Sequence, residues 1–463
     1  MVLSKFKQET GYFMSDKLKH KLQNRHIQMI ALGGVIGTGL FFGAAKSIQS
    51  TGPSIMLSYI LGGLIIYIIM RALGEMTIDS PSSGSFSDYA GRYLGNYAGF
   101  IAGWTAWFEY TVVCMVELTV VTVFLDYWLP GLPHWLICLG LLFIFTSIQL
   151  ISVRMFGEFE FWFAGIKIVA IILMLLFSAY LVTFNARIHH ETIQNLHGYA
   201  SLDVFFAGGL KGFLFSLVIV VFSFGGTEFV SIAAGEAEDP RKSIPKAISG
   251  VIIRIILFYI LTILAIICLY PFNKLNANVS PFVDVFKEIG INQAATVMNA
   301  VAITAALSAF NSCLYAASRM LFSLATHGSA PKSLAKLNKV NIPSRALIVT
   351  SLCVLVAVVM NYLFPDKAIM YLLIIATCAI LTCWGLILFT QIAFRRDKQK
   401  KQVVLDYRLL FYPYSTVFAI LVLGMVMLIM LWMEDMRMSV IVTPIWIGAL
   451  SIIYAFRRKL GAR

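Results

Sequence analysis

Apolar stretches long enough to cross a lipid bilayer follow one another along almost the whole chain. A transmembrane helix needs about 20 consecutive, mostly apolar residues. Twelve such stretches can be marked in the sequence, at about residues 27–46, 53–74, 95–125, 134–152, 160–184, 205–235, 245–271, 292–326, 346–363, 369–391, 411–433 and 439–457. In lipid, a helix of this length satisfies all of its own backbone hydrogen bonds. The sequence therefore predicts an all-α integral membrane protein with 12 transmembrane helices.

Composition agrees with a lipid environment and excludes several classes of protein. Hydrophobic residues make up 59% of the 463 residues and charged residues 13%, against roughly 45–50% and ~25% in soluble domains. A single soluble core stops growing at about 250–300 residues and could not hide this excess. Soluble enzymes, nucleic-acid-binding proteins and disordered chains are thereby excluded. The chain has no HExxH, GxSxG or CxxC motif, so neither an enzyme, a metal site nor a disulfide framework is predicted.

The distribution of basic residues predicts the orientation in the membrane. With the N-terminus inside, the inner segments hold 27 Lys and Arg and the outer segments seven, which is a strong positive-inside asymmetry. The net charge of +13 is thus attributed to orientation rather than to a nucleic-acid partner. The predicted organisation is a cytoplasmic tail 1–26, a ten-helix core 27–391, a basic cytoplasmic linker 392–410, helices 11 and 12 within 411–457, and a cytoplasmic tail 458–463. No cleavable signal peptide is expected in the tail, because its first 25 residues are polar and basic.

Two of the apolar stretches contain clustered glycines, which weaken a continuous helix. The first reads ALGGVIGTGLFFG (31–43) and the sixth VFSFGGTEFVSIAAGE (221–236). A glycine costs a helix about 1 kcal/mol relative to alanine. The two stretches open the two halves of a five-plus-five arrangement, 27–184 and 205–391, and such paired interruptions indicate a transporter site at a repeat interface. The alternative is that the glycines serve close packing of helices.

An interrupted helix in mid-membrane leaves backbone N–H and C=O groups without partners, which is costly unless they line a polar cavity. A zwitterionic ligand supplies both kinds of partner. Its carboxylate can accept from the N–H groups at the start of a half-helix, where the dipole also favours negative charge. Its ammonium can donate to the free carbonyls, and glycine lets the ligand approach the backbone closely.

Longer motifs resemble a known family. The segment LQNRHIQMIALGGVIGTGLF (22–41) resembles the opening of bacterial amino acid permeases of the amino acid–polyamine–organocation superfamily. Similar motifs are LGEM (73–76), SGSF (83–86), GEFEFWFAGIK (157–167), FSFGGTEF (222–229), AAGEAEDPRKSIPKAI (233–248), SPF (280–282) and SRMLFSLATHGSAPK (318–332). The resemblance implies the LeuT-like fold, with two inverted five-helix repeats, broken helices 1 and 6 and two extra C-terminal helices. It also implies proton-driven amino acid uptake across the bacterial cytoplasmic membrane, with both termini cytoplasmic.

The resemblance carries site residues over to this chain. The substrate carboxylate is expected on the backbone N–H groups of Gly37, Thr38 and Gly39. The ammonium is expected on carbonyls of the two breaks, namely Val35, Phe222, Ser223 and Gly225. Phe222 is expected as an aromatic gate, or alternatively as a core aromatic residue. The side-chain pocket is expected to include Tyr110, Asn311 and Cys313, although polar residues there also serve as interhelical hydrogen bonds.

Three ionisable residues inside apolar stretches are assigned to proton coupling, because a charge there costs at least ~2.5 kcal/mol and indicates function. Lys167 lies about 10 Å into the fifth stretch. The resemblance implies that its ammonium stands where sodium-coupled relatives bind a cation; the alternative is snorkelling to the surface. Glu228 lies beside the sixth-stretch break, and Glu117 lies in MVELT (115–119). A structural hydrogen bond to a backbone carbonyl is the alternative for both acids.

Together these observations predict a secondary active transporter that imports amino acids by proton symport with alternating access. The expected substrate is a neutral, aromatic or other hydrophobic amino acid. Proline, GABA or small neutral amino acids are the alternative substrates, and an exchanger or sodium-coupled carrier of the same fold, or an amino acid sensor, are the alternative functions. No cofactor is expected beyond the proton as coupling ion, and the expected partners are the amino acid, protons and membrane lipid, with the monomer as the functional unit.

Overall fold

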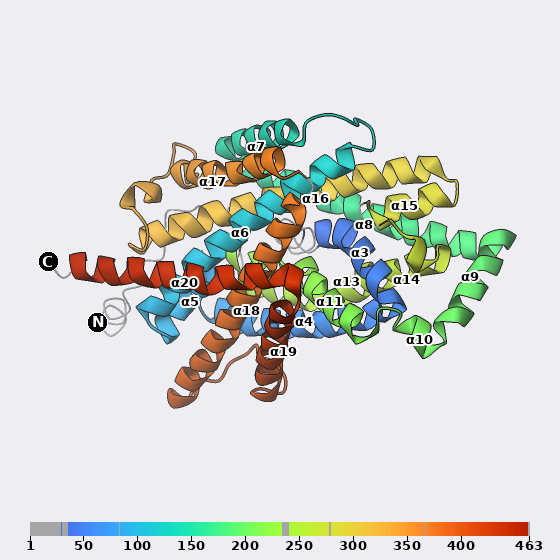
Figure 1. The fold of residues 1–463 in the computed structure, drawn as a ribbon. Helices are drawn as coiled ribbons and strands as arrows, with labels where there is room; N and C mark the ends of the chain where they lie inside the picture. Colours follow the sequence, from blue (N-terminus) through green and yellow to red (C-terminus); the bar gives the residue numbers. More distant parts are fainter. Residues whose placement is uncertain are drawn as a thin grey trace.

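The computed structural model describes residue 29 and residues 36–82, 84–233, 240–276, 279–365 and 367–461. All regular structure in these residues is helical. Val35, predicted to bind the substrate ammonium, lies outside the described residues. The helices form one elongated bundle in which the C-terminal helix crosses in front of the others (Figure 1).

Ten helical runs in the described residues are long and apolar enough to cross a membrane. They contain the helices α4 (Ile55–Asp79), α6 (Asn96–Leu125), α7 (His134–Ile151), α8 (Val153–Phe184), α11 (Gly209–Ser223), α16 (Asn292–Thr326), α17 (Ser344–Leu363), α18 (Ala368–Lys400), α19 (Tyr414–Trp432) and α20 (Glu434–Gly461). The shorter elements are η1 (Gly39–Gly43), α3 (Ala44–Thr51), η2 (Gly52–Ser54), α5 (Ser85–Tyr93), α9 (Ala186–Tyr199), α10 (Leu202–Phe205), α12 (Phe229–Ala233), α13 (Pro240–Ile255), η4 (Ile256–Ile260), α14 (Leu261–Leu269), η5 (Phe272–Lys274), α15 (Pro281–Glu288) and η6 (Lys332–Ala335).

The second predicted span and residues 39–46 of the first form one helical run of 41 residues, Gly39–Asp79. A straight helix of that length would extend about 60 Å, twice the hydrocarbon core of a bilayer. The run is interrupted at Gly52, whose φ of +72° ends α3 before Pro53. Figure 1 shows α3 and α4 leading away from each other in different directions. The seventh predicted span is divided between α13, the π-helical turn η4 and α14.

The glycine-rich sixth stretch is broken where the sequence places the break. Helix α11 ends at Ser223 and α12 begins at Phe229. Between them Gly226 has a φ of +91°, which a residue with a side chain rarely adopts. The first stretch is described from residue 36, where two bent residues precede η1, a π-helical turn. Both segments therefore bring irregular backbone into the interior.

Helices α6, α16 and α18 form the centre of the bundle and are mostly buried, whereas α7, α8 and α20 are mostly exposed. Their outward faces carry large apolar side chains such as Phe143, Leu176 and Ile445. Apolar residues on the outside are expected for helices that face lipid tails. The broken segments lie against the buried central helices.

Helix α18 extends to Lys400, beyond the end at 391 that the sequence predicts, so the first part of the predicted linker 392–410 is helical. The extension is held on α4 by two ion pairs, Arg395–Glu75 and Lys398–Asp79. Two basic residues of the predicted linker are therefore paired with acids from another helix.

Candidate functional site

A small cavity lies where the two interrupted segments meet in the centre of the bundle. Its volume is about 20 Å³, which is room for about one water molecule. Its lining comes from both breaks and from α6, α12, α16 and α18, namely Gly37, Gly39, Val113, Glu117, Phe222, Ser223, Gly225, Phe229, Ala309, Cys313 and Ile380. A cavity of this volume is too small for an amino acid, so the two breaks are closed against each other in this structure.

The glycines of the first break are required by close contacts with neighbouring segments. A Cβ atom on Gly39 would lie 2.4 Å from Cα of Ser223, so the two breaks touch backbone to backbone. A Cβ atom on Gly37 would lie 3.2 Å from Oε1 of Glu117 and 3.3 Å from Cβ of Ala309. Any larger residue at position 39 would push the broken segments apart.

Glu117 of α6 reaches the start of the first broken segment. Its Oε1 accepts a hydrogen bond from the hydroxyl of Thr38 at 2.9 Å. Its Oε2 is buried and has no hydrogen-bond partner among the described residues. Glu117 thus lies beside the residues at which the sequence places the substrate carboxylate.

Lys167 of α8 lies fully buried on the other side of the first break. Its ammonium donates to the carbonyl of Ile36 at 3.0 Å and to Oγ of Ser308 at 3.0 Å. Ser308 in turn donates to Oε1 of Glu160 at 2.7 Å. Glu160 and Glu117 both act electrostatically on the ammonium. The lysine therefore connects the broken backbone to two buried carboxyl groups and does not reach the surface.

Glu228 closes the second break. Its carboxyl group accepts from the backbone N–H of Gly226 at 3.2 Å and from Nε1 of Trp384 at 3.4 Å. Glu109 of α6, also buried, interacts with Glu228 and with Cys383. A second pair of acids therefore lies in the interior, next to the sixth-stretch break.

The residues predicted for the side-chain pocket are only partly brought together. Cys313 and Phe222 line the cavity. Asn311 does not, because its carbonyl and its Oδ1 accept from the side chain of Gln149 at 2.7 and 3.0 Å. Tyr110 packs against Phe229 with ring centroids 4.9 Å apart, outside the cavity lining. For Asn311 the geometry matches the alternative of an interhelical hydrogen bond.

The structure adds functional candidates that the sequence analysis did not single out. Glu160 lies seven residues before Lys167, which places both on nearly the same helix face, so this spacing could have indicated it. Ser308 and Tyr259 carry no such signal in an apolar sequence. The hydroxyl of Tyr259 donates to the carbonyl of Ser223 at 2.9 Å. One predicted ammonium acceptor is therefore already hydrogen-bonded in this closed state.

Comparisons with known proteins cover nearly the whole chain. The sequence model of the amino acid permease family matches residues 26–463. The chain belongs to the amino acid permease family. It is 42% identical to the aromatic amino acid transport protein AroP of Escherichia coli (strain K12) over 449 residues, which are 97% of this chain and 98% of that protein. It is 40% identical to the amino-acid permease AapA of Bacillus subtilis (strain 168) over 453 residues, which are 97% of each.

A similar match, 42% over 444 residues and 96% of each chain, is found with AroP of Salmonella typhimurium (strain SL1344). The family resemblance in the sequence is thereby confirmed. This permease is a multi-pass membrane protein that transports amino acids, and it is not an enzyme.

Proposed function

We propose that this permease imports amino acids by proton symport across the bacterial cytoplasmic membrane, with both termini on the cytoplasmic side. The fold proposed is LeuT-like, with twelve spans in which two inverted repeats precede α19 and α20. Two features support this number: the run Gly39–Asp79 joins residues 39–46 of the first predicted span to the whole second span, and α13, η4 and α14 together are long enough for one more. The protein is proposed to work as a monomer.

The proposed substrate is a neutral amino acid with an aromatic or other hydrophobic side chain. Relatives named as aromatic amino acid transport proteins support this choice. So does the cavity lining, where Gly225 adds no side chain beside Ile380 and Phe222 offers an aromatic surface. Proline, GABA and small neutral amino acids remain the alternative substrates, and exchange remains the alternative mode of transport.

The observation that carries the mechanism is the hydrogen bond between Thr38 and Glu117. As an anion, Glu117 competes with the substrate carboxylate for the N–H groups of Gly37, Thr38 and Gly39. After Glu117 takes up a proton it no longer carries the charge that the half-helix start favours. The substrate carboxylate can then replace it, while carbonyls of the two breaks receive the ammonium. Proton uptake and substrate binding would therefore be coupled at one place.

Lys167 would link proton uptake by Glu117 to movement of the first broken segment. Its ammonium holds the carbonyl of Ile36 and is balanced by Glu160 and Glu117. When Glu117 is protonated, the balance of charge around Lys167 changes, and the ammonium can release its proton or its carbonyl partner. The inner part of the first broken segment would then be free to tilt with that of the second. Glu228 and Glu109 form a second proton-accepting pair beside the other break.

The test is uptake of a panel of labelled amino acids into sodium-free proteoliposomes with an imposed inward proton gradient. We expect accumulation of neutral aromatic amino acids that a protonophore abolishes. Rapid exchange against preloaded amino acid without accumulation would make the protein an exchanger. Accumulation only with sodium would contradict proton coupling, and binding without any flux would favour a sensor.

A further inference from the structure

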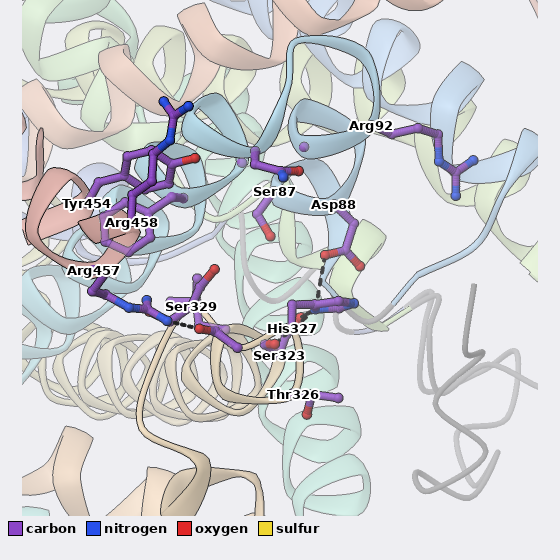
Figure 2. A pocket seen from close by; sticks show the side chains of 16 residues that line it. Ser87, Asp88, Arg92, Ser323, Thr326, His327, Ser329, Tyr454, Arg457 and Arg458 are labelled. Atoms are coloured by element: carbon purple, nitrogen blue, oxygen red, sulfur yellow. Dashed lines mark hydrogen bonds and ion pairs between the residues drawn. The ribbon is translucent and has the colours of Figure 1, made fainter. Parts of the chain in front are cut away.

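Several polar groups that line cavities in this permease are paired within the chain itself. Figure 2 shows this in a cavity of about 740 Å³ between α5, α6, α16 and α20, where Asp88 contacts His327 at 3.5 Å. On another wall of it, Arg457 donates to the carbonyl of Ser329 at 2.6 Å. At the central cavity, pairing of the same kind involves the backbone of the two breaks, which the proposed transport cycle uses.

The carbonyl of Ser223, at the end of α11, has such a partner. The hydroxyl of Tyr259 donates to it at 2.9 Å. Tyr259 is buried and belongs to the π-helical turn η4, and π-helical turns often lie at functional sites. Ser223 lines the central cavity and leaves no room for a Cβ atom on Gly39 of the first break. The tyrosine therefore acts where the two breaks touch.

Aromatic packing fixes the ring of Tyr259. The ring of Tyr59, from α4, lies with its centroid 5.2 Å away, and that of Phe224 lies 5.0 Å away. The hydroxyl of Tyr59 bonds to Oγ of Ser223 at 3.4 Å rather than to the carbonyl. Two tyrosines thus approach the same residue, and Tyr259 is the one that engages its backbone.

This bond satisfies a group that would otherwise be costly to bury. The last carbonyls of a helix have no partner within it, and the negative end of the helix dipole favours a cation there. In the proposed function the substrate ammonium is such a cation. The central cavity, of about 20 Å³, has no room for an amino acid, so in this closed arrangement the hydroxyl of Tyr259 supplies the partner instead.

The first break is paired in a corresponding way. The hydroxyl of Thr38, beside the N–H groups expected to receive the substrate carboxylate, donates to Glu117 at 2.9 Å. An acid of α6 and a hydroxyl of η4 therefore engage the two breaks with the same polarity as the carboxylate and the ammonium of an amino acid. With both in place, the breaks can close on each other without a substrate.

We propose that Tyr259 is a positioning residue of the transport cycle, whose hydroxyl pairs the Ser223 carbonyl when the permease closes without substrate and yields it to the ammonium when substrate binds. A symporter that accumulates its substrate has to close without it once in every cycle, so that the site returns to the outer side. An exchanger returns with a second substrate bound. The hydroxyl therefore serves net import and is not required for exchange. This inference rests on the proposed function.

The test compares Tyr259→Phe with the unmodified permease in proteoliposomes that take up labelled phenylalanine. The variant keeps the ring and its packing but cannot donate. Net uptake driven by a proton gradient should fall at least about fivefold, because closure without substrate then buries an unpaired carbonyl. Exchange against preloaded phenylalanine should change little. Tyr59→Phe is the matched control, because it removes an equally buried hydroxyl that does not engage the carbonyl, and it should leave both rates unchanged.

Melting temperatures in detergent give a second measurement. Relative to the unmodified permease, Tyr259→Phe should melt at a lower temperature without phenylalanine and at nearly the same temperature when phenylalanine is saturating. An equal lowering under both conditions, an equal loss of net uptake and exchange, or failure to fold even with phenylalanine present would make the hydroxyl structural and overturn the proposal. A smaller fall in net uptake overturns it as well. Weaker binding of phenylalanine would make the hydroxyl a direct substrate ligand and also contradict it.

The proposed function and this inference can fail separately. If the unmodified permease exchanges phenylalanine without accumulating it, proton symport fails, and the pair of melting temperatures still decides whether the hydroxyl is needed only in the absence of substrate. If phenylalanine is not transported, the proposed substrate class fails, and the amino acid of the panel that is transported best takes its place in both measurements.

Discussion

Two buried charged clusters hold helices together in this permease, and they differ in how completely their polar atoms are satisfied. At the end of α4, both carboxylate oxygens of Glu75 are used. They accept from the guanidinium of Arg395, from Nε2 of Gln391 at 3.1 Å and from the backbone N–H of Leu409. Gln391 also accepts from Thr416 at 3.0 Å. This cluster locks α4, α18 and the segment before α19 into one unit.

The cluster around Lys167 is different. The ammonium donates to a backbone carbonyl and to Ser308, and Ser308 donates in turn to Glu160. Oε2 of Glu160 and Oε2 of Glu117 are buried without a hydrogen-bond partner among the described residues. A fully satisfied ion pair has one stable arrangement, whereas a cluster with spare acceptor atoms can take up a proton and rearrange. The first cluster is suited to structure and the second to coupling.

The largest effect on transport is expected when the cation of the Lys167 cluster is removed. Lys167→Ala should lower proton-driven accumulation by at least about 100-fold, because it deletes the cation that holds the first break and leaves two buried acids without it. Uptake into proteoliposomes measures this. Lys211→Ala, which removes an exposed lysine of α11, is the matched control and should transport normally. Undiminished accumulation in Lys167→Ala would assign the lysine to structure alone.

Disrupting the cluster around Glu75 should instead lower the stability of the folded protein. Glu75→Ala leaves the guanidinium of Arg395 without its buried partner, which typically costs about 3–5 kcal/mol. We expect a clearly lower melting temperature in detergent, while substrate affinity of the folded fraction is retained. Asp79→Ala removes the partner of Lys398 in a more exposed pair, worth at most about 1 kcal/mol, and serves as control. An equal loss from both variants would remove the distinction between the clusters.

A subtler effect is expected from Glu117→Gln, which keeps the shape and an acceptor for Thr38 but cannot exchange a proton. Substrate binding should persist and lose its dependence on pH. Accumulation driven by a proton gradient should fall about tenfold or more, one decade being about 1.4 kcal/mol of lost coupling, while exchange is preserved. Binding at several pH values, together with exchange and net uptake, separates these results. A variant that still accumulates substrate would place the coupling proton elsewhere, with the Glu109–Glu228 pair as the next candidate.

The two clusters also illustrate which features of the structure can be predicted from the sequence and which cannot. Helical spans follow from apolar runs because a backbone in lipid has few other solutions. The break after Ser223 follows from Gly225 and Gly226, which weaken a helix locally. Lys167 stands out because a charge in an apolar run is rare. These signals are local and can be read without knowing the fold.

Partners that come from distant helices give no such signal. Ser308 approaches Lys167 from a helix 141 positions away, and a serine among alanines has no distinctive pattern. The same holds for Gln149, which engages Asn311 and takes it out of the predicted pocket. The helical end of α18 beyond 391 is likewise not indicated by the sequence, because nothing near Arg395 and Lys398 points to their partners Glu75 and Asp79 on another helix. Pairing across the bundle is decided by packing.

The last expected effect, at Gly225, concerns substrate size rather than charge. A Cβ atom there would lie 2.6 Å from Cδ1 of Ile380, the flexible end of a side chain. Gly225→Ala should therefore fold, with a loss of about 1–3 kcal/mol, or roughly 10- to 200-fold, in affinity for the bulkiest substrates and less for small ones. Adding Ile380→Val removes Cδ1 and should restore much of the aromatic affinity. Competition for uptake by phenylalanine and by alanine measures both effects, with Ile380→Val alone as control. If the double variant binds aromatic substrates no better than Gly225→Ala, the added methyl acts on the backbone of the break and not on the space for the substrate.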